Sequence, residues 1–193
     1  MENVTIFWFR RDLRLEDNRG LYYALEENER VLPIFIFDTD ILDLLDPKND
    51  ARIEFIHKQV KELKNNLEKR GSSLMIMHGK PFDILTSLVR NYNLKKIYFN
   101  HDYEPYAIAR DLRISQFMEK NHIQVKSFKD QTIFEKKEIL KKDGKPYTVF
   151  TPYMKKWKEQ LNLNSPVRYP VKSYSDRFIQ TKSYKMPSIS ELG

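Results

Sequence analysis

Residues 8–19, WFRRDLRLEDNR, place a dense group of charges directly after a run of apolar residues. The charged side chains are those of Arg10, Arg11, Asp12, Arg14, Glu16, Asp17 and Arg19. They can line a wall that receives a polar ligand or a partner domain. They can equally form a local network of ion pairs, in which each exposed pair contributes only ~0–1 kcal/mol. The residue types alone leave both interpretations open.

Other polar residues follow apolar runs in the same way. Asp38 and Asp40 come after residues 31–37, where they can contact a ribose or cap a helix. Asp102 and Glu104 lie in NHDYEP (100–105). They can form a carboxylate pair at the rim of a binding site, or they can be two solvated acids in a loop. The histidines are scattered without paired spacing, so we expect no metal site. Neither GxGxxG nor GxxxxGK[ST] occurs, which argues against a pyrophosphate held on backbone amides.

The elements that must position these residues follow from two alternating periodicities. Short apolar runs at 4–9, 31–37, 73–78, 96–100 and 123–128 are typical of strands buried on both faces. Amphipathic stretches at 18–28, 51–70, 81–92 and 105–121 predict helices between them. We therefore expect a doubly wound α/β domain with a five-stranded parallel sheet, order 3-2-1-4-5, and helices on both faces. Ligands of such sheets bind beyond the carboxyl ends of the strands, here between strands 1 and 4.

The alternation stops after residue 130. We expect the domain to span residues 1–130 and residues 131–193 to form an extended linker with a short helix near 152–162. Residues 136–185 carry 13 Lys and Arg against 4 Asp and Glu. Such a basic segment can contact nucleic acid, or it can be a solvated extension.

The composition indicates in which part of the cell the protein is expected to work. The chain has no cysteine, no apolar run long enough to span a membrane and no signal-peptide pattern at its start. We expect a soluble, cytoplasmic protein without a membrane partner.

Several blocks, in order along the chain, resemble the DNA photolyase and cryptochrome flavoprotein family, and most of all its bacterial-type deoxyribodipyrimidine photolyases. WFRRDLRLEDN is similar to the opening signature of that family, W-x-R-x-DLR-x-x-DN. The likeness continues in VLPIFIFDTDIL (31–42), ARIEFIHKQVKELKNNLEKRGSSL (51–74), NHDYEPYAIARD (100–111) and VFTPYMKKW (149–157).

The resemblance implies the N-terminal α/β antenna domain of a light-driven DNA repair lyase. In the family, a linker leads to a helical C-terminal domain that holds FAD, and reduced FAD donates an electron to split a cyclobutane pyrimidine dimer in UV-damaged DNA. The chain ends where relatives enter that domain, so we expect an N-terminal fragment that does not repair DNA alone. The full-length form is expected to be a monomer that contacts its own helical domain, and the face prepared for that domain should expose an apolar patch.

The resemblance also suggests site residues. A deazaflavin or FMN antenna would occupy the crevice beyond the carboxyl ends of strands 1 and 4. A folate antenna is less favoured, because Tyr106 and Ala107 stand where folate-binding members carry Asn-Glu. Many relatives bind no antenna. The matching crevice positions are Arg10, Phe37, Asp38, Ile41, Leu42, Lys48, Arg52, Asp102 and Glu104. Arg11, Asp12 and Arg14 are expected to contact the helical domain, and several charges of this loop should be unpaired without it.

Two other functions stay open. The domain can belong to a cryptochrome, a photoreceptor without repair activity, or it can be a stand-alone nucleotide-binding α/β module.

Overall fold

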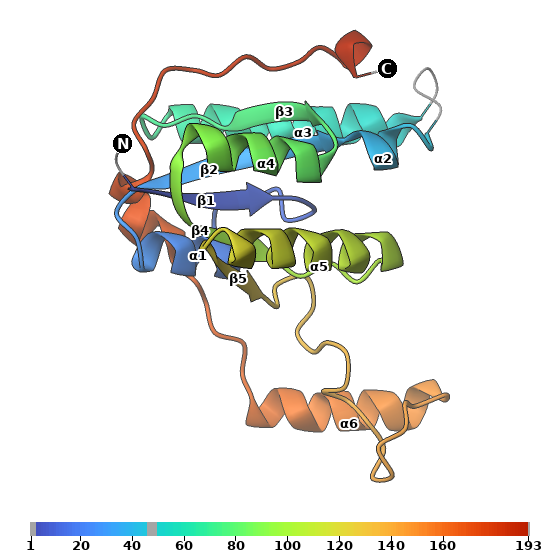
Figure 1. The fold of residues 1–193 in the computed structure, drawn as a ribbon. Coiled ribbons are helices and arrows are strands. Elements are labelled where there is room, and N and C mark those ends of the chain that lie inside the picture. The colour runs from blue at the N-terminus through green and yellow to red at the C-terminus, as the bar shows by residue number, and fades with distance from the viewer. Residues whose placement is uncertain (1–2, 46–49, 193) are drawn as a thin grey trace.

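The computed structural model describes residues 3–45 and 50–192, and the predicted site residue Lys48 lies outside this part of the chain. Its strands and helices alternate along the first 128 residues (Figure 1). The strands are β1 (Asn3–Phe9), β2 (Val31–Asp38), β3 (Met75–Gly79), β4 (Asn93–Asn100) and β5 (Gln124–Phe128). The helices are α1 (Arg19–Glu26), α2 (Thr39–Leu42), α3 (Ala51–Glu68), α4 (Pro81–Asn91), α5 (Pro105–Lys120), α6 (Phe150–Leu163) and the 3₁₀ helices η1 (Val171–Arg177) and η2 (Ile189–Glu191).

The strands form one parallel sheet in the order β3-β2-β1-β4-β5, which confirms the predicted topology. Alternate residues of each central strand point to opposite faces, so each face has its own core. Phe7 and Phe35 lie in the core beneath α1 and α3. Trp8 and Ile34 lie in the core beneath α4 and α5. Helices therefore cover both faces, as predicted (Figure 1).

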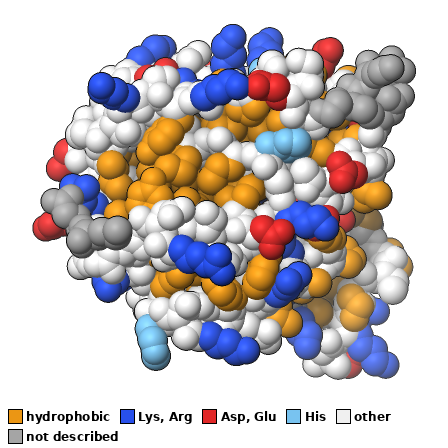
Figure 2. All heavy atoms as spheres, turned by 45° about the horizontal axis from the view of Figure 1, so that its top comes forward, with side chains coloured by type: hydrophobic (Ala, Val, Ile, Leu, Met, Phe, Trp, Pro, Cys, Tyr) orange, Lys and Arg blue, Asp and Glu red, His pale blue; other side chains and the backbone are white. Residues whose placement is uncertain are grey.

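The expectation that every strand is buried on both faces is wrong for β3 and β5. No residue of either strand is fully buried, whereas all eight residues of β2 are. Both strands lie at the edges of the sheet, where each has only one neighbouring strand. Figure 2 shows apolar side chains gathered on the face that carries β3 and the C-terminal segment, with lysine and arginine side chains around them.

The predicted linker contains two different parts. Residues 129–170 carry α6 away from the sheet on two connectors, and no residue of α6 is buried (Figure 1). The following residues return to the domain, where Val171, Phe178 and Leu192 join the core beneath α1 and α3. Ile179 extends the attachment by donating its backbone N–H to the Val31 carbonyl over 2.9 Å. Helix α6 covers the stretch near 152–162 where the sequence predicts a short helix, and the last part of the segment packs on the domain. Its role in linking two domains stays a prediction.

Candidate functional site

Because β1 and β4 are neighbours, the polar segments that follow them meet at one edge of the sheet. The segment after β1 is the charged loop that begins at Arg10, and the segment after β4 is NHDYEP. The sheet thus brings together the two segments whose composition first suggested a site.

A buried hydrogen-bond network joins these two segments. Asp12, Asn18 and Asn100 are at most 4% exposed. The Asn100 side-chain amide donates to the Asp12 carboxylate over 2.6 Å and to Asn18 Oδ1 over 2.8 Å. Asn18 Oδ1 also accepts from Leu21 N and so caps α1. The side-chain oxygen of Asn100 accepts from Gly20 N, and a Cβ on that glycine would lie 2.5 Å from it.

This network gives Asp12, which the resemblance assigns to contacts with a second domain, a role inside the fold. Both of its carboxylate oxygens are used inside the fold: one accepts from the backbone N–H of Arg10 at 2.8 Å and the other from Asn18 and Asn100. A buried carboxylate needs such partners, because an unsatisfied polar group in the interior is costly. Asp12 therefore fixes the turn after β1.

A second network lies on the α5 side of the edge. The Arg10 guanidinium donates to both oxygens of Asp111 over 2.7 and 2.6 Å and also to the Asn100 carbonyl. Arg110 donates to Asp111 over 3.1 Å and to Asp38 over 3.2 Å. Alternating charges thus connect the ends of β1 and β2 to α5. The side chains of Arg10 and Arg110 are only 7% and 9% exposed.

Trp8 and Tyr106 complete this arrangement. The Trp8 ring has the guanidinium carbons of Arg10 and Arg110 at 5.2 and 4.9 Å from its centroid, within the range of cation–π attraction. The Tyr106 hydroxyl donates to Asp38 over 2.8 Å. Burial and this carboxylate raise the pKa of Tyr106, so the hydroxyl keeps its proton and remains a donor.

The remaining crevice residues from the prediction lie in three settings. Phe37 and Leu42 are buried in the core, and Ile41 is 42% exposed. Asp102 and Glu104 both pair with Arg11, at 3.2 and 3.3 Å.

Arg52 lies apart from these pairs, at the start of α3. It pairs with Asp50, the N-cap of that helix, and this hydrogen-bonded pairing lowers the pKa of Asp50 to about 2.

The expectation that several charges of the loop are unpaired is wrong for most of them. Besides the pairs of Arg10 and Arg11, Arg14 pairs with Asp130 at 2.8 Å and Glu16 with Arg70 at 2.9 Å. Asp17 accepts from the backbone N–H of Tyr169 at 3.0 Å, and the Arg19 guanidinium lies over the Tyr169 ring. Of the two interpretations of the loop, the local network describes most of its charges.

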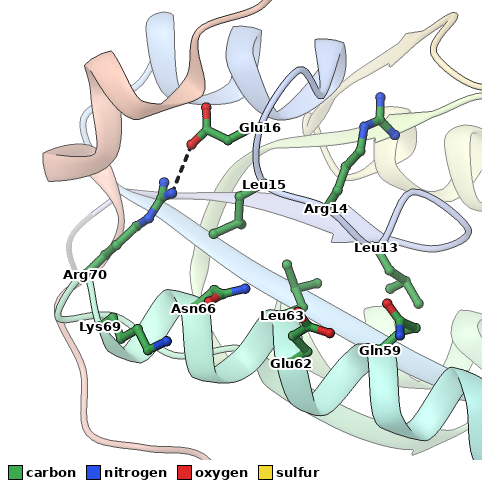
Figure 3. Close-up of a pocket in the computed structure, with 10 residues that line it drawn as sticks. All are labelled: Leu13, Arg14, Leu15, Glu16, Gln59, Glu62, Leu63, Asn66, Lys69 and Arg70. Carbon is green, nitrogen blue, oxygen red and sulfur yellow. Dashed lines mark hydrogen bonds and ion pairs between the residues drawn. The ribbon is translucent and has the colours of Figure 1, made fainter.

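A groove of about 430 Å³ lies beside the same loop, on the α3 side. Figure 3 shows Leu15 pointing from the loop, and Leu63 from α3, into one apolar space, which the Glu16–Arg70 ion pair closes at one end. Within residues 3–45 and 50–192 there is no cluster of three or more potential metal ligands.

Arg110 and Asp111 belong to this candidate site, although the sequence patterns did not single them out. Both residues stand in NHDYEPYAIARD (100–111), one of the segments that resemble the family. That resemblance is the sequence feature that could have indicated them. Arg110 pairs with Asp38, 72 positions away, and Asp111 with Arg10, 101 positions away. These pairs require the sheet order and the start of α5, which no local pattern specifies.

Comparison with known proteins assigns this arrangement to a family. Residues 5–171 match the family model described as DNA photolyase. The chain belongs to the DNA photolyase family. It is 32% identical over 160 residues to a deoxyribodipyrimidine photo-lyase of Synechococcus, covering 83% of this chain and 33% of that protein. The chain therefore spans about a third of that photolyase relative.

Solved photolyase structures have the same fold. A bacterial class III photolyase from Agrobacterium tumefaciens superimposes with a TM-score of 0.80 and 28% identity, covering 98% of this chain and 38% of that one. An archaeal photolyase from Sulfolobus tokodaii, described with two FAD molecules, gives a TM-score of 0.69 and 30% identity over 86% of this chain and 36% of that one. Among the described residues, no helix is long and apolar enough to cross a membrane.

Proposed function

We propose that this chain is the N-terminal α/β domain of a deoxyribodipyrimidine photolyase that splits cyclobutane pyrimidine dimers in UV-damaged DNA. The family match over residues 5–171 carries the proposal, because it includes both polar segments of the sheet edge. Reduced FAD, held in a helical C-terminal domain, would supply the electron for the reaction. Enzymes of this kind extrude the target from the base stack. Because the flavin would be held by the helical domain, residues 1–193 by themselves should be inactive.

The chain's own residues would give the edge of the sheet a fixed shape. The two networks around Asp12 and Asp111 hold the ends of β1, β2 and β4 through the chain's own side chains. Arg11 and Arg14 remain at the surface, with side chains 56% and 44% exposed. We assign these two arginines to contacts with the helical domain, because Asp12 uses both of its carboxylate oxygens inside the fold.

An antenna in the crevice fits the described residues only at its outer rim. Arg10, Asp38 and Asp102 already have charged partners, and their side chains are at most 9% exposed. Ile41, Glu104 and Arg52 are the members of the described set that solvent reaches. A deazaflavin or FMN would therefore contact this rim. We assign no antenna contact to Arg10, Asp38 or Asp102.

The basic segment supports an auxiliary contact with DNA phosphates. Between residues 136 and 158 there are eight lysines and two acids, and Lys156 is the described lysine of this stretch that pairs with an acid, Glu159, at 3.0 Å. We expect weak binding to duplex DNA that falls steeply with salt, because phosphate contacts release counterions. Binding of the same strength at low and high salt would contradict this contact.

The decisive experiment uses the protein as its gene encodes it. Irradiated DNA is incubated under blue light, the loss of cyclobutane dimers is measured, and an absorption spectrum is taken of the same sample. Light-dependent repair with a flavin spectrum supports the proposal. A flavin spectrum without repair of these dimers favours a cryptochrome or a six-four photolyase. No flavin from a complete gene product favours a stand-alone module.

A further inference from the structure

A serine, a histidine and a glutamate from three separate segments meet beside the outer strand β5. Ser127 lies in β5, His101 follows β4 directly, and Glu135 lies on the connector that leads to α6 (Figure 1). His101 Nε2 is 3.1 Å from Ser127 Oγ, and His101 Nδ1 is 2.9 Å from Glu135 Oε1. The imidazole therefore bridges a hydroxyl and a carboxylate, which is the arrangement that activates serine nucleophiles on unrelated folds.

The hydrogen bonds of this group determine where its protons lie. Burial raises the pKa of Glu135, but its hydrogen bonds with Tyr103 and His101 outweigh burial and lower the pKa below the ordinary value of 4.5. At neutral pH the carboxylate is therefore ionised and can only accept, so His101 Nδ1 carries the proton between them. In the neutral imidazole Nε2 then has a lone pair, and the Ser127 hydroxyl donates to it.

Burial increases from the hydroxyl to the carboxylate. Ser127 is exposed, the His101 side chain is 24% exposed and the Glu135 side chain is 13% exposed. A molecule in solution can thus reach the hydroxyl, while the protein shields the charge that orients the imidazole. A shielded carboxylate stabilises an imidazolium more strongly than a carboxylate in bulk water does, because the local dielectric constant is lower.

Hydrogen bonds of the surrounding chain hold the histidine and the glutamate in place. His101 donates its backbone N–H to the Phe128 carbonyl over 2.7 Å, and its own carbonyl accepts from the Gln131 side chain over 3.0 Å. The second carboxylate oxygen of Glu135 accepts from the Tyr103 hydroxyl over 2.5 Å. The base and its carboxylate are therefore oriented before a substrate arrives, which removes part of the entropic cost of the reaction.

Strand β5 also provides a donor for the negative charge that develops on a carbonyl oxygen under attack. β4 is its single neighbour in the sheet. In a strand, the backbone groups of successive residues point alternately toward and away from such a neighbour. The Phe128 carbonyl accepts from His101 on the β4 side, so the backbone N–H of Ser127 points to the outer edge. The backbone N–H of the nucleophile is one of the two oxyanion donors in serine proteases.

We propose that Ser127 is the nucleophile and His101 its general base in the hydrolysis of small carboxylic esters, with Glu135 as the positioning residue of the imidazole. Ser127 Oγ attacks the ester carbonyl while its proton passes to His101 Nε2, which returns that proton to the departing alcohol. A water molecule then adds to the acyl group by the same proton path, so that the carboxylic acid leaves and the Ser127 hydroxyl is restored. One ester and one water give one acid and one alcohol.

The open setting of the hydroxyl defines the substrate class. Because Ser127 is exposed, the site favours short acyl groups, since a long apolar chain bound there would remain in water. This activity goes beyond the proposed function, because it uses neither flavin nor DNA.

The test treats the protein, as its gene encodes it, in the dark with a fluorescent alkyl fluorophosphonate, which forms a phosphonate ester with an activated serine and releases fluoride. Peptide mass spectrometry locates the label, and p-nitrophenyl acetate measures ester hydrolysis. We expect the label at Ser127 and not at Ser87, an exposed serine of α4 that accepts from the Asn91 amide. Ser127→Ala should abolish the label, and Ser87→Ala should retain it. His101→Gln should slow labelling and hydrolysis about a hundredfold, the usual contribution of a general base.

Glu135 requires a readout that a purely structural role would not change, because it also anchors the connector to α6. Glu135→Gln should lower kcat for the ester with KM unchanged, and Glu135→Asp should restore part of the rate. Circular dichroism verifies that each variant is folded. Labelling of Ser127 no faster than that of Ser87, or equal hydrolysis by Ser127→Ala and the unaltered protein, would overturn the proposal. Neither result changes the proposed photolyase function, which the repair assay tests separately.

Discussion

The side-chain amide of Asn100, at the end of β4, donates a hydrogen bond to the Asp12 carboxylate beyond β1 over 2.6 Å. The two residues are 88 positions apart in the sequence and are both almost completely buried. Their bond joins the two strands between which the chain reverses its direction of winding. The edge where family members are expected to bind ligands is therefore held by buried side-chain hydrogen bonds instead of a flexible glycine turn.

Asp12→Ala should lower the free energy of unfolding by about 2–3 kcal/mol. The substitution leaves the buried amides of Asn18 and Asn100 with fewer acceptors, and an unsatisfied buried donor costs ~1–3 kcal/mol. Urea denaturation measures the change. Glu16→Ala provides the control: it removes the exposed half of the Glu16–Arg70 pair and should cost only ~0–1 kcal/mol. Equal losses of unfolding free energy in the two variants would contradict a structural role for the Asp12–Asn100 hydrogen bond.

The sequence was sufficient to predict the sheet, because alternating strand and helix periodicities are local signals. It also placed Arg10 and Asp102 at one edge, since that follows from strand order alone. It did not predict that Asp12 turns inward while Arg11 turns outward. That difference depends on which side chain finds buried amide donors, here Asn18 and Asn100, and these partners come from distant parts of the chain. The same reason explains the missed core position of Phe178, whose surrounding residues lack periodicity.

The Arg10–Asp111 pair should show a large coupling energy in a double-mutant cycle. Arg10→Met alone leaves the partly buried carboxylate of Asp111 with less compensation and should cost ~3 kcal/mol, as should Asp111→Leu. The double variant Arg10→Met/Asp111→Leu should lose less than the sum, with a coupling of ~1–3 kcal/mol. The exposed Lys156–Glu159 pair on α6 serves as the control, with an expected coupling of ~0–1 kcal/mol. Additive losses at Arg10 and Asp111 would show that the pair contributes nothing beyond its separate members.

Phe178→Ala should destabilise the domain by ~3–5 kcal/mol, the usual cost of removing a buried aromatic ring. Phe178 is 2% exposed and pairs with the start of β2, although it lies far beyond the last strand of the sheet. Phe150→Ala on α6, at a site 71% exposed, should change stability by less than ~0.5 kcal/mol. Denaturation curves of the two variants test whether the C-terminal segment belongs to the folding unit of the domain. If Phe178→Ala unfolds at the same urea concentration as the unaltered chain, residues 171–192 are an independent extension.

The base of the α6 connector should loosen in acid, because it depends on the ionised Glu135 carboxylate. Glu135 accepts from His101 at 2.9 Å and from the Tyr103 hydroxyl at 2.5 Å, which ties residues 131–138 to the end of β4. Burial alone would raise the pKa of Glu135, but these hydrogen bonds outweigh it and lower the pKa below its ordinary value of 4.5. A carboxylate with a lowered folded-state pKa contributes its full stabilisation above pH ~4.5 and loses it as the pH falls through the folded-state value. Hydrogen exchange of the backbone amides of residues 131–138 should therefore accelerate, relative to that of β1, only on the acid side of that range.

Glu135→Gln supplies the control for this pH dependence, because it preserves the shape of the side chain and removes its titration. The variant should exchange faster at neutral pH and respond less to acid, with the remainder due to Glu138, whose pKa is also lowered by its bond with Lys129. At the alkaline end, burial and Glu135 raise the pKa of Tyr103 to about 12, so its hydroxyl should continue to protect the connector above the ordinary tyrosine pKa of 10.0. An acid response that is the same in Glu135→Gln and in the unaltered chain would show that another group controls the connector. The attachment of α6 to the domain would then not depend on this carboxylate.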